Sequence, residues 1–217
     1  MEVIGQFNLG FIIARLNDDL YLLDQHACDE KYRFETLQSS TTIHRQQLLQ
    51  PLLLEASPSD EAVIESNLGI FEANGFGIVI DESASPGNRI KLTALPYVKS
   101  TQFNQQDVLE LASMLSACNA EETSKLIVKN QGQSVMLPKL MSMYASRACR
   151  SAVMIGKALS HSEMRSIVKN LGTIEQPWNC PHGRPTMRHL EDMKNVKRRK
   201  LMRAQELIHS VMQSEIR

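Results

Sequence analysis

The chain has 217 residues, of which 42% are hydrophobic and 22% charged, a composition typical of a soluble folded protein that argues against disorder of the whole chain. Its formal net charge is zero, which argues against a protein that coats nucleic acid over much of its surface. No stretch is long and apolar enough to predict a membrane span.

The N-terminal part predicts a β-hairpin that leads into a helix. Residues 5–16 are rich in aromatic and branched apolar side chains and predict one strand, and residues 20–23 predict a second strand after the polar turn at 17–19. At Asp24 the pattern changes to a helical one that runs to about Gln38. The first residues enter this strand pattern directly and do not predict a secretory signal peptide.

The middle of the chain has the pattern of a separate subdomain. After breaks at Gln50-Pro51 and 57–59 it predicts a helix from Asp60 to a stop at Asn74-Gly75, strands over 76–80 and 90–95, and a helix over 107–117. The inward face of this last helix is expected to consist of Val108, Leu111, Ala112 and Leu115. We therefore expect an inserted α/β subdomain over 52–135 and an outer subdomain of sheet and helices over 1–51 and 136–217. The predicted fold class is α+β.

The C-terminal part combines helices with one irregular loop. It predicts a helix that begins near Pro138, a helix opened by the capping box Ser160-x-x-Glu163 and closed by Gly172, a proline-locked loop over 177–185, and a basic, helix-prone tail from Met187. A solvated helix, a contact with a partner and a DNA-steering patch are all compatible with the tail, residues 194–217.

The junction of strand and helix at Asp24-Gln25-His26-Ala27 is the first candidate site. His26 and Glu30 are four residues apart, so their side chains project from one face of the helix within reach of a common ion. An imidazole and a carboxylate together suit zinc, manganese or iron. Asp24 is expected either to cap the helix or to orient the His26 ring. The alternative is a capped helix with a surface His–Glu pair.

The second candidate is Cys180-Pro181-His182 in the proline-locked loop. A cysteine and a histidine at this spacing can bind one metal ion, and Cys149 on an upstream helix can complete a pair of thiolates. The alternative is a buried cysteine beside a hydrogen-bonded histidine. The four cysteines lack tight disulfide spacing and predict reduced thiols in a cytosolic or nuclear setting, and Cys28 and Cys118 are interpreted as packing residues.

Taken together, the two candidates offer more metal ligands than one tetrahedral site uses. The set is His26, Glu30, Cys149, Cys180 and His182. It suits two metal ions that share Glu30 as a bridging carboxylate, and such a pair can activate water and stabilise the leaving oxygen of a phosphodiester. Sequence spacing does not show whether the three segments meet in the fold.

Several motifs resemble those of the MutL family of DNA mismatch repair proteins, and they occur in the family's order. Asp24-Gln25-His26-Ala27-x-x-Glu30-x4-Glu35 resembles the family's endonuclease motif DQHA(x)2E(x)4E. Residues 145–150 resemble its ACR motif, and residues 180–185 resemble its C-P/N-H-G-R-P motif. The match is closest to the post-meiotic-segregation branch of eukaryotic homologues.

The resemblance implies a metal-dependent endonuclease that nicks double-stranded DNA with two bound ions of zinc, manganese or both. It carries over as metal ligands His26, Glu30, Cys149, Cys180 and His182, as a further essential acid Asp24, and as supporting motif residues Gln25, Glu35 and Arg184. It further implies a nuclear protein, an outer subdomain that forms a heterodimer with an MLH-type MutL homologue, and an inserted subdomain that regulates. The family's ATPase module is not in this chain, so no ATP site is predicted.

A further resemblance concerns a sliding clamp. Residues 46–51 resemble the family's clamp-binding motif QxLIxP, with Leu49 in place of isoleucine, so the residues expected to bind the clamp are Gln46, Leu48, Leu49 and Pro51. A plain connection between loop and strand is the alternative. For the whole chain, the alternative function is a non-catalytic dimerisation scaffold with one structural zinc ion.

Overall fold

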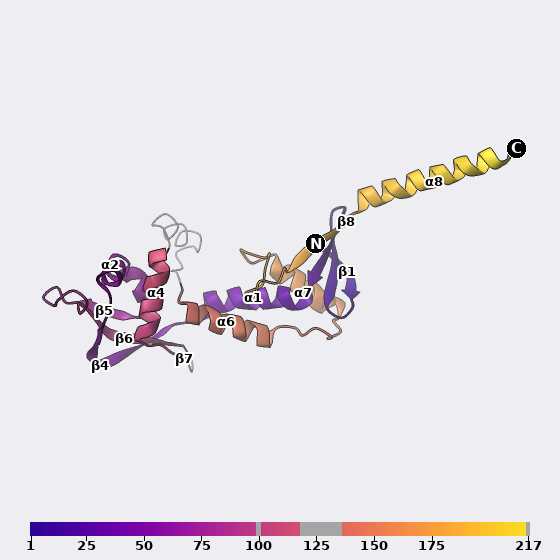
Figure 1. The fold of residues 1–217 in the computed structure, drawn as a ribbon. Coiled ribbons are helices and arrows are strands. Elements are labelled where there is room, and N and C mark those ends of the chain that lie inside the picture. Colours follow the sequence, from indigo (N-terminus) through magenta and orange to yellow (C-terminus); the bar gives the residue numbers. More distant parts are fainter. Residues whose placement is uncertain (99–100, 118–135, 216–217) are drawn as a thin grey trace. The chain divides into compact units, whose positions relative to one another are not determined.

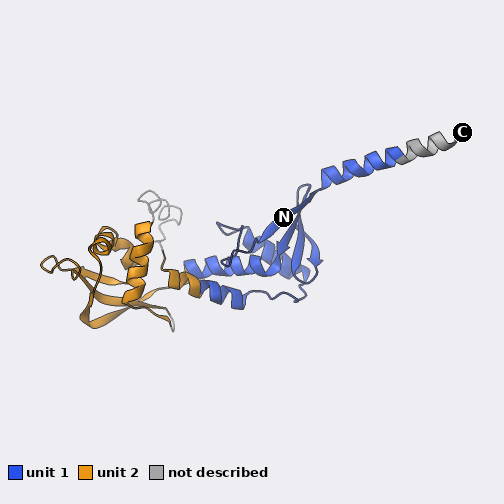
Figure 2. Ribbon diagram, viewed as in Figure 1, with its two compact units in different colours: residues 1–39, 144–217 blue, residues 40–143 orange. Residues whose placement is uncertain are grey.

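The computed structural model describes residues 1–98, 101–117 and 136–215, with side chains to residue 206. Their contacts divide the chain into two compact units, and each is described by itself. Unit 1 consists of residues 1–39 and 144–217, and unit 2 of residues 40–143 (Figure 2). Among the described helices, none is long and apolar enough to cross a membrane.

Unit 1 combines an antiparallel sheet with helices (Figure 1). Its strands are β1 (Glu2–Phe7), β2 (Phe11–Leu16), β3 (Asp19–Asp24) and β8 (Met187–Asp192), in the order β1-β2-β3-β8. Its helices are α1 (Gln25–Ser40), the second part of α6 (Pro138–Ser151), α7 (His161–Leu171) and α8 (Met193–Glu215). The pairing of β3 with β8 brings the C-terminal part of the chain next to the start of α1.

The core of unit 1 lies between the sheet and α7. Met164, Ile167 and Leu171 recur at helical spacing on α7 and are buried in one cluster with residues of the sheet that include Val3 and Ile12. Full burial of each such side chain stabilises the fold by about 1.5–3 kcal/mol. The predicted capping box and the stop at Gly172 are both present at the ends of α7.

Unit 2 packs helices on a second antiparallel sheet. Its strands are β4 (His44–Leu54), β5 (Gly77–Ile80), β6 (Ile90–Val98) and β7 (Thr101–Gln102), and its helices are α2 (Pro58–Ser66), α3 (Leu68–Ala73) and α4 (Gln105–Ala117). The sheet order is β4-β6-β5, and β7 pairs with β6. The mixture of antiparallel sheets and helices confirms the predicted α+β class.

Two local predictions for unit 2 are confirmed. The predicted inward face of α4 is buried, and its members are Val108, Leu111, Ala112 and Leu115. Gly75 follows α3 with a φ of +91°, and a Cβ at this position would stand 2.8 Å from side-chain atoms of Ile43 and Pro96. Only glycine meets both conditions without strain.

The prediction of one strand over residues 5–16 is wrong. The structure has two strands there, β1 and β2, which pair with each other across a turn at residues 8–10. Asn8 and Leu9 both have a φ of +48°, and the Gly10 amide donates to the Phe7 carbonyl. The apolar character of Leu9 hid a turn that the backbone makes in the left-handed region.

The predicted break at Gln50-Pro51 is also wrong, because β4 runs through it. The pairing of β4 with β6 shifts register between Gln47 and Leu52, so Pro51 lies in a bulge where its missing N–H costs no ladder hydrogen bond. Residues 40–51 and 136–143, predicted in the outer subdomain, belong to unit 2. The last residues of the predicted insert, 118–135, lie outside the described residues, and the roles assigned to the two parts stay predictions.

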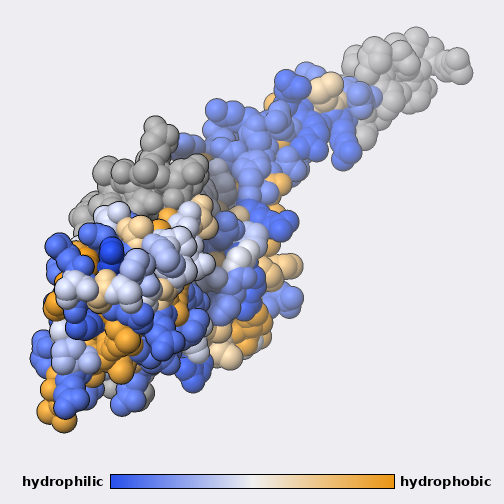
Figure 3. Space-filling model, turned by 60° about the vertical axis from the view of Figure 1, so that its left-hand side comes forward, coloured by the Kyte–Doolittle hydropathy of each residue, from blue (hydrophilic) through white to orange (hydrophobic). Residues whose placement is uncertain are grey.

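Two helical predictions differ from the structure in detail. The predicted helix from Asp60 is divided at Asn67, whose side-chain amide donates to the Val63 carbonyl and ends α2. The predicted helical tail begins as β8, because pairing with β3 overrides the helical propensity of residues 187–192. Beyond it the described part of α8 is largely hydrophilic and exposed, as Figure 3 shows.

The capping box gives unit 1 a dependence on pH. Hydrogen bonds from Lys157 and Ser160 lower the pKa of Glu163 from 4.5 to about 2. A lowered pKa means that the charged form stabilises the folded state, so this stabilisation is complete above pH 4.5 and is lost as the pH falls towards 2. We expect the difference in melting temperature between the chain and Glu163→Gln to shrink across this window, in a series of thermal melts. A difference independent of pH would contradict the prediction.

Candidate metal centre

The strand β3 leads directly into α1, and this junction is fixed from two sides. The Asp24 carboxylate accepts the Ala27 amide at 2.9 Å and so caps the helix. The backbone amide of Asp24 donates to the Thr186 carbonyl at 2.9 Å, at the end of the proline-locked loop. The first turn of α1 therefore lies against the loop that carries Cys180 and His182.

The structure brings together the five predicted metal ligands, which come from three segments. They form two groups in which the ligand atoms lie within 4.8 Å of one another: His26, Glu30 and Cys149, and Glu30, Cys180 and His182. The sequence identified these side chains as possible metal ligands, and the structure adds that the three segments lie close together. Their role as ligands stays a prediction.

Glu30 belongs to both groups and is completely buried. Its Oε1 lies 2.5 Å from Nδ1 of His182, and its Oε2 lies 3.7 Å from Nε2 of His26. Oε2 has no hydrogen-bond partner by geometry among the described residues. A buried carboxylate oxygen without a hydrogen bond is costly unless a cation balances it, and the donor set around it therefore fits a metal ion.

The orientation of His26 leaves one ring nitrogen available. Its Nδ1 lies 2.9 Å from the Val153 carbonyl oxygen, which can only accept, so Nδ1 carries the hydrogen. In the neutral ring Nε2 then has a free lone pair, and it lies 3.6 Å from Sγ of Cys149. This arrangement, with one nitrogen held by a carbonyl, is the usual way in which proteins orient a metal-binding histidine.

The loop over residues 177–185 is held by its own backbone. The Cys180 amide donates to the Arg184 carbonyl at 2.8 Å, and the Gly183 amide donates back to the Cys180 carbonyl at 2.9 Å. Gly183 has a φ of +81°, which glycine adopts without strain. The turn directs Cys180 into the protein and leaves the His182 side chain 46% exposed.

Burial raises the pKa of the Cys180 thiol, and the nearby Glu30 carboxylate raises it further. Both effects favour the neutral thiol in the protein alone. A divalent cation reverses this balance, because a thiolate bound to a metal ion is stabilised by the charge of the ion.

Three other predicted residues support the site without joining either group. Gln25 is fully buried, accepts a hydrogen bond from Gln6, and donates to the carbonyls of Leu9, Met154 and Lys157. Glu35 accepts the amides of Glu175 and Gln176 and pairs with Lys31. The Arg184 side chain is exposed, and its carbonyl closes the loop turn.

Sequence reasoning missed Asp29 and Val153. Asp29 is a buried carboxylate on α1 that accepts the Val153 amide at 2.9 Å and Nε of Arg33 at 2.8 Å. The four-residue spacing of Asp29 and Arg33 was a signal that could have identified this ion pair. Val153 acts through its backbone, so its side chain gave no signal.

The predicted clamp-binding residues lie in unit 2, on β4. Gln46 is exposed and pairs in register with Leu95, and Leu49 is fully exposed in the bulge. Leu48 is half-buried and Pro51 exposed. Clamp binding by these residues stays a prediction.

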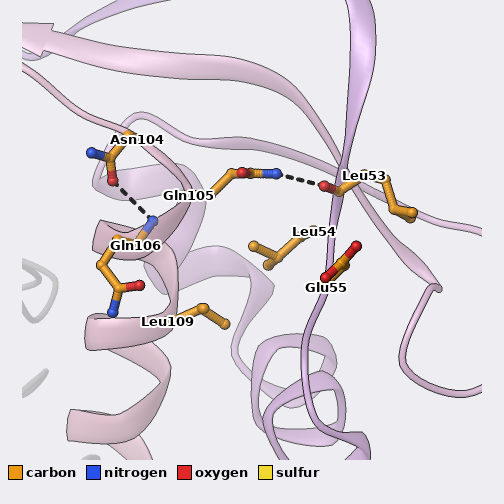
Figure 4. A pocket seen from close by; sticks show the side chains of 7 residues that line it. All are labelled: Leu53, Leu54, Glu55, Asn104, Gln105, Gln106 and Leu109. Atoms are coloured by element: carbon orange, nitrogen blue, oxygen red, sulfur yellow. Dashed lines mark hydrogen bonds between the residues drawn. The ribbon is translucent and has the colours of Figure 1, made fainter.

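Unit 2 also contains a cavity of about 620 Å³ between the end of β4 and the start of α4 (Figure 4). Its lining is Leu53, Leu54, Glu55, Asn104, Gln105, Gln106 and Leu109. The Gln105 amide donates to the Leu53 carbonyl across it. Amide and aliphatic side chains predominate, so this cavity lacks the clustered ligands of unit 1, and we place the candidate chemistry in unit 1.

Comparison with known proteins identifies a family that this chain matches. Residues 4–159 match the family model described as the MutL C terminal dimerisation domain. Similar proteins include the mismatch repair endonuclease PMS2 of Gallus gallus, 49% identical over 193 residues, and that of Homo sapiens, 48% identical over 193 residues. The DNA mismatch repair protein PMS1 of Arabidopsis thaliana is 47% identical over 194 residues. Each alignment covers 89% of this chain and 21% of the relative, so the chain spans about a fifth of their length.

The buried amide of Gln25 gives a test of the structure around the site. Gln25→Ala removes the side-chain hydrogen bonds to the carbonyls of Leu9 and Met154, which keep only the amides of Gly156 and Lys157, and it leaves a cavity where the buried side chain was. We therefore expect the free energy of unfolding to fall by about 2 kcal/mol, measured by chemical denaturation. Gln106→Ala, an exposed glutamine near the start of α4, is the control and should change it by less than about 0.5 kcal/mol. Equal losses of unfolding free energy in the two variants would contradict a structural role for the Gln25 side chain.

Proposed function

The chain belongs to the MutL C-terminal dimerisation domain family, and from this premise we propose that it is a metal-dependent endonuclease module that nicks DNA during mismatch repair. The observation that carries the proposal is the buried Glu30 carboxylate, shared by two groups of ligand-type side chains. The relatives named mismatch repair endonucleases support the reaction class.

The residues present fit two divalent ions, zinc or manganese. His26 and Cys149 would hold one ion and Cys180 and His182 the other, with the Glu30 carboxylate common to both. Thiolate and imidazole ligands favour zinc, and the carboxylate and imidazoles also accept manganese. Such ions, when bound, supply an activated water and stabilise the leaving oxygen of a phosphodiester.

The side chains of this chain then have distinct roles. The buried Glu30 carboxylate would balance the charge of the ions, and the Val153 carbonyl fixes the ring of His26. Asp24 caps α1 and so sets the direction in which His26 and Glu30 point. The exposed His182 lies on the side of the site that solvent reaches, where a DNA strand would approach.

We propose an MLH-type MutL homologue as the partner, in a heterodimer formed through unit 1. The family description names dimerisation, and β1 stands at the edge of its sheet with exposed apolar residues. Ile4 is 53% exposed and Phe7 54% exposed, and Leu9 follows in the turn at 47%. Exposed apolar side chains gathered along a sheet edge are typical of a protein–protein contact.

Further partners follow from the same family. Double-stranded DNA is the proposed substrate, and the bulge of β4 with Gln46, Leu48, Leu49 and Pro51 is the proposed contact for a sliding clamp, supported by the full exposure of Leu49. We propose that the protein acts in the nucleus, where that substrate is.

The shared carboxylate provides the direct test of the activity. In the full-length protein with its partner, we expect Glu30→Gln to lower manganese-dependent nicking of closed-circular DNA by about 100-fold or more, because the ions lose their common ligand. Metal content should fall in parallel. Glu65→Gln, which changes an exposed glutamate on α2, is the control and should nick normally.

Two results would overturn the proposal. Nicking that Glu30→Gln does not change would remove the catalytic role of the site. A single bound ion, retained in Glu30→Ala, would favour the alternative of a dimerisation scaffold with one structural zinc.

The proposed partner surface has its own test. Ile4→Asp places a charge in the contact, so we expect the dissociation constant of the heterodimer to rise by 10-fold or more, measured by analytical ultracentrifugation. Val79→Asp is a matched control, because Val79 is a branched residue, 51% exposed, on the outer strand β5 of unit 2. If both substitutions changed the dissociation constant equally, β1 would not be the contact surface.

A further inference from the structure

Asp29 is a buried carboxylate that neither ligand group includes. It is 6% exposed and lies on α1 immediately before Glu30. One of its oxygens, Oδ2, accepts both the Val153 amide and Nε of Arg33. A carboxylate this deeply buried is costly unless hydrogen bonds satisfy it. Because Asp29 is itself held on α1, its hydrogen bond fixes the position of the Val153 backbone.

Both backbone polar groups of Val153 are hydrogen-bonded to side chains of α1. Its N–H donates to Asp29 at 2.9 Å, and its carbonyl accepts Nδ1 of His26 at 2.9 Å. It comes two residues after the end of α6, where the helix no longer supplies backbone partners. A continuous chain of hydrogen bonds therefore runs from Arg33 through Asp29 and the Val153 backbone to the His26 ring.

The same segment is held a second time by Gln25. The Gln25 amide donates to the carbonyl of Met154 at 3.0 Å and to that of Lys157 at 3.3 Å. These bonds hold the residues after Val153, and Asp29 holds Val153 itself. Loss of Asp29 should therefore release the one peptide that orients His26 and leave the rest of the segment in place.

We propose that Asp29 is a positioning residue of the metal centre, acting through the Val153 backbone to fix the His26 ring with Nε2 towards the metal ion. This inference rests on the proposed function, since it assumes that His26 binds metal. Residues that orient a metal ligand in this way typically change metal affinity by about 10- to 100-fold when they are replaced.

A purely structural role for Asp29 predicts a different result. A buried ion pair that only stabilised the fold would lower stability on mutation and leave metal affinity unchanged. Asp107 in unit 2 offers the matched comparison. It is 5% exposed, accepts the Asn104 amide at 2.7 Å and pairs with Lys139 at 3.1 Å, so it has the same two kinds of partner and contacts none of the five ligand-type residues in the groups of unit 1.

The experiment measures zinc affinity by competition with a chelating dye, on the full-length protein with its partner. We expect Asp29→Ala to weaken zinc binding by about 10- to 100-fold, and Asp29→Asn, which keeps an acceptor for the Val153 amide, to weaken it less. Asp107→Ala should lower the melting temperature and leave zinc affinity within twofold. In the cobalt-substituted protein, the absorption bands of the bound ion should shift in Asp29→Ala and not in Asp107→Ala.

The outcomes separate this inference from the proposed function. If the unmodified protein binds zinc and both Asp29 variants bind it equally well, with unshifted cobalt bands, the positioning role is overturned and the metal centre stands. If the unmodified protein binds neither zinc nor manganese, the proposed function fails and this inference fails with it. Because Asp29→Asn preserves size and one acceptor, it keeps the test decisive if Asp29→Ala does not fold.

Discussion

The buried carboxylate of Glu30 is the interaction on which the organisation of unit 1 depends. Its side chain has no exposure to solvent, and only one of its oxygens is hydrogen-bonded among the described residues. A single buried negative charge is costly, so the protein must surround it with groups that balance it. His182 approaches one oxygen and His26 the other, and the thiols of Cys149 and Cys180 complete a shell suited to cations.

The secondary structure explains how distant residues reach this carboxylate. The pairing of β3 with β8 places the loop before β8 beside the first turn of α1, which brings Cys180 and His182 to Glu30. The helix α6 contributes Cys149, and the segment after it returns a backbone carbonyl to His26. Each contribution comes from a different part of the chain, so the site exists only when unit 1 is folded. Under the proposed function, metal binding is therefore coupled to folding.

The sequence predicted side-chain chemistry better than backbone geometry. Three features depend only on residues a few positions apart, so they can be read from the sequence. They are the common helix face of His26 and Glu30, the capping box at Ser160 and the buried face of α4. The turn at Asn8 and Leu9 and the passage of β4 through Pro51 depend on pairing with distant strands, so local patterns misread them. The role of Val153 could not be predicted from the sequence for a different reason. It contributes its backbone carbonyl, a group that every residue has.

The two histidines differ in exposure, so the site has one buried side and one side that solvent can reach. His26 is 5% exposed and fixed by the Val153 carbonyl, whereas the His182 side chain is 46% exposed on a loop held by its own turn. A ligand buried and fixed in this way favours a firmly held ion, and a ligand open to solvent favours exchange and access. Under the proposed function a phosphodiester therefore approaches from the side of His182, while the His26 and Cys149 side keeps the fixed geometry. The Glu30 carboxylate joins the two sides and couples a rigid half of the site to an accessible one.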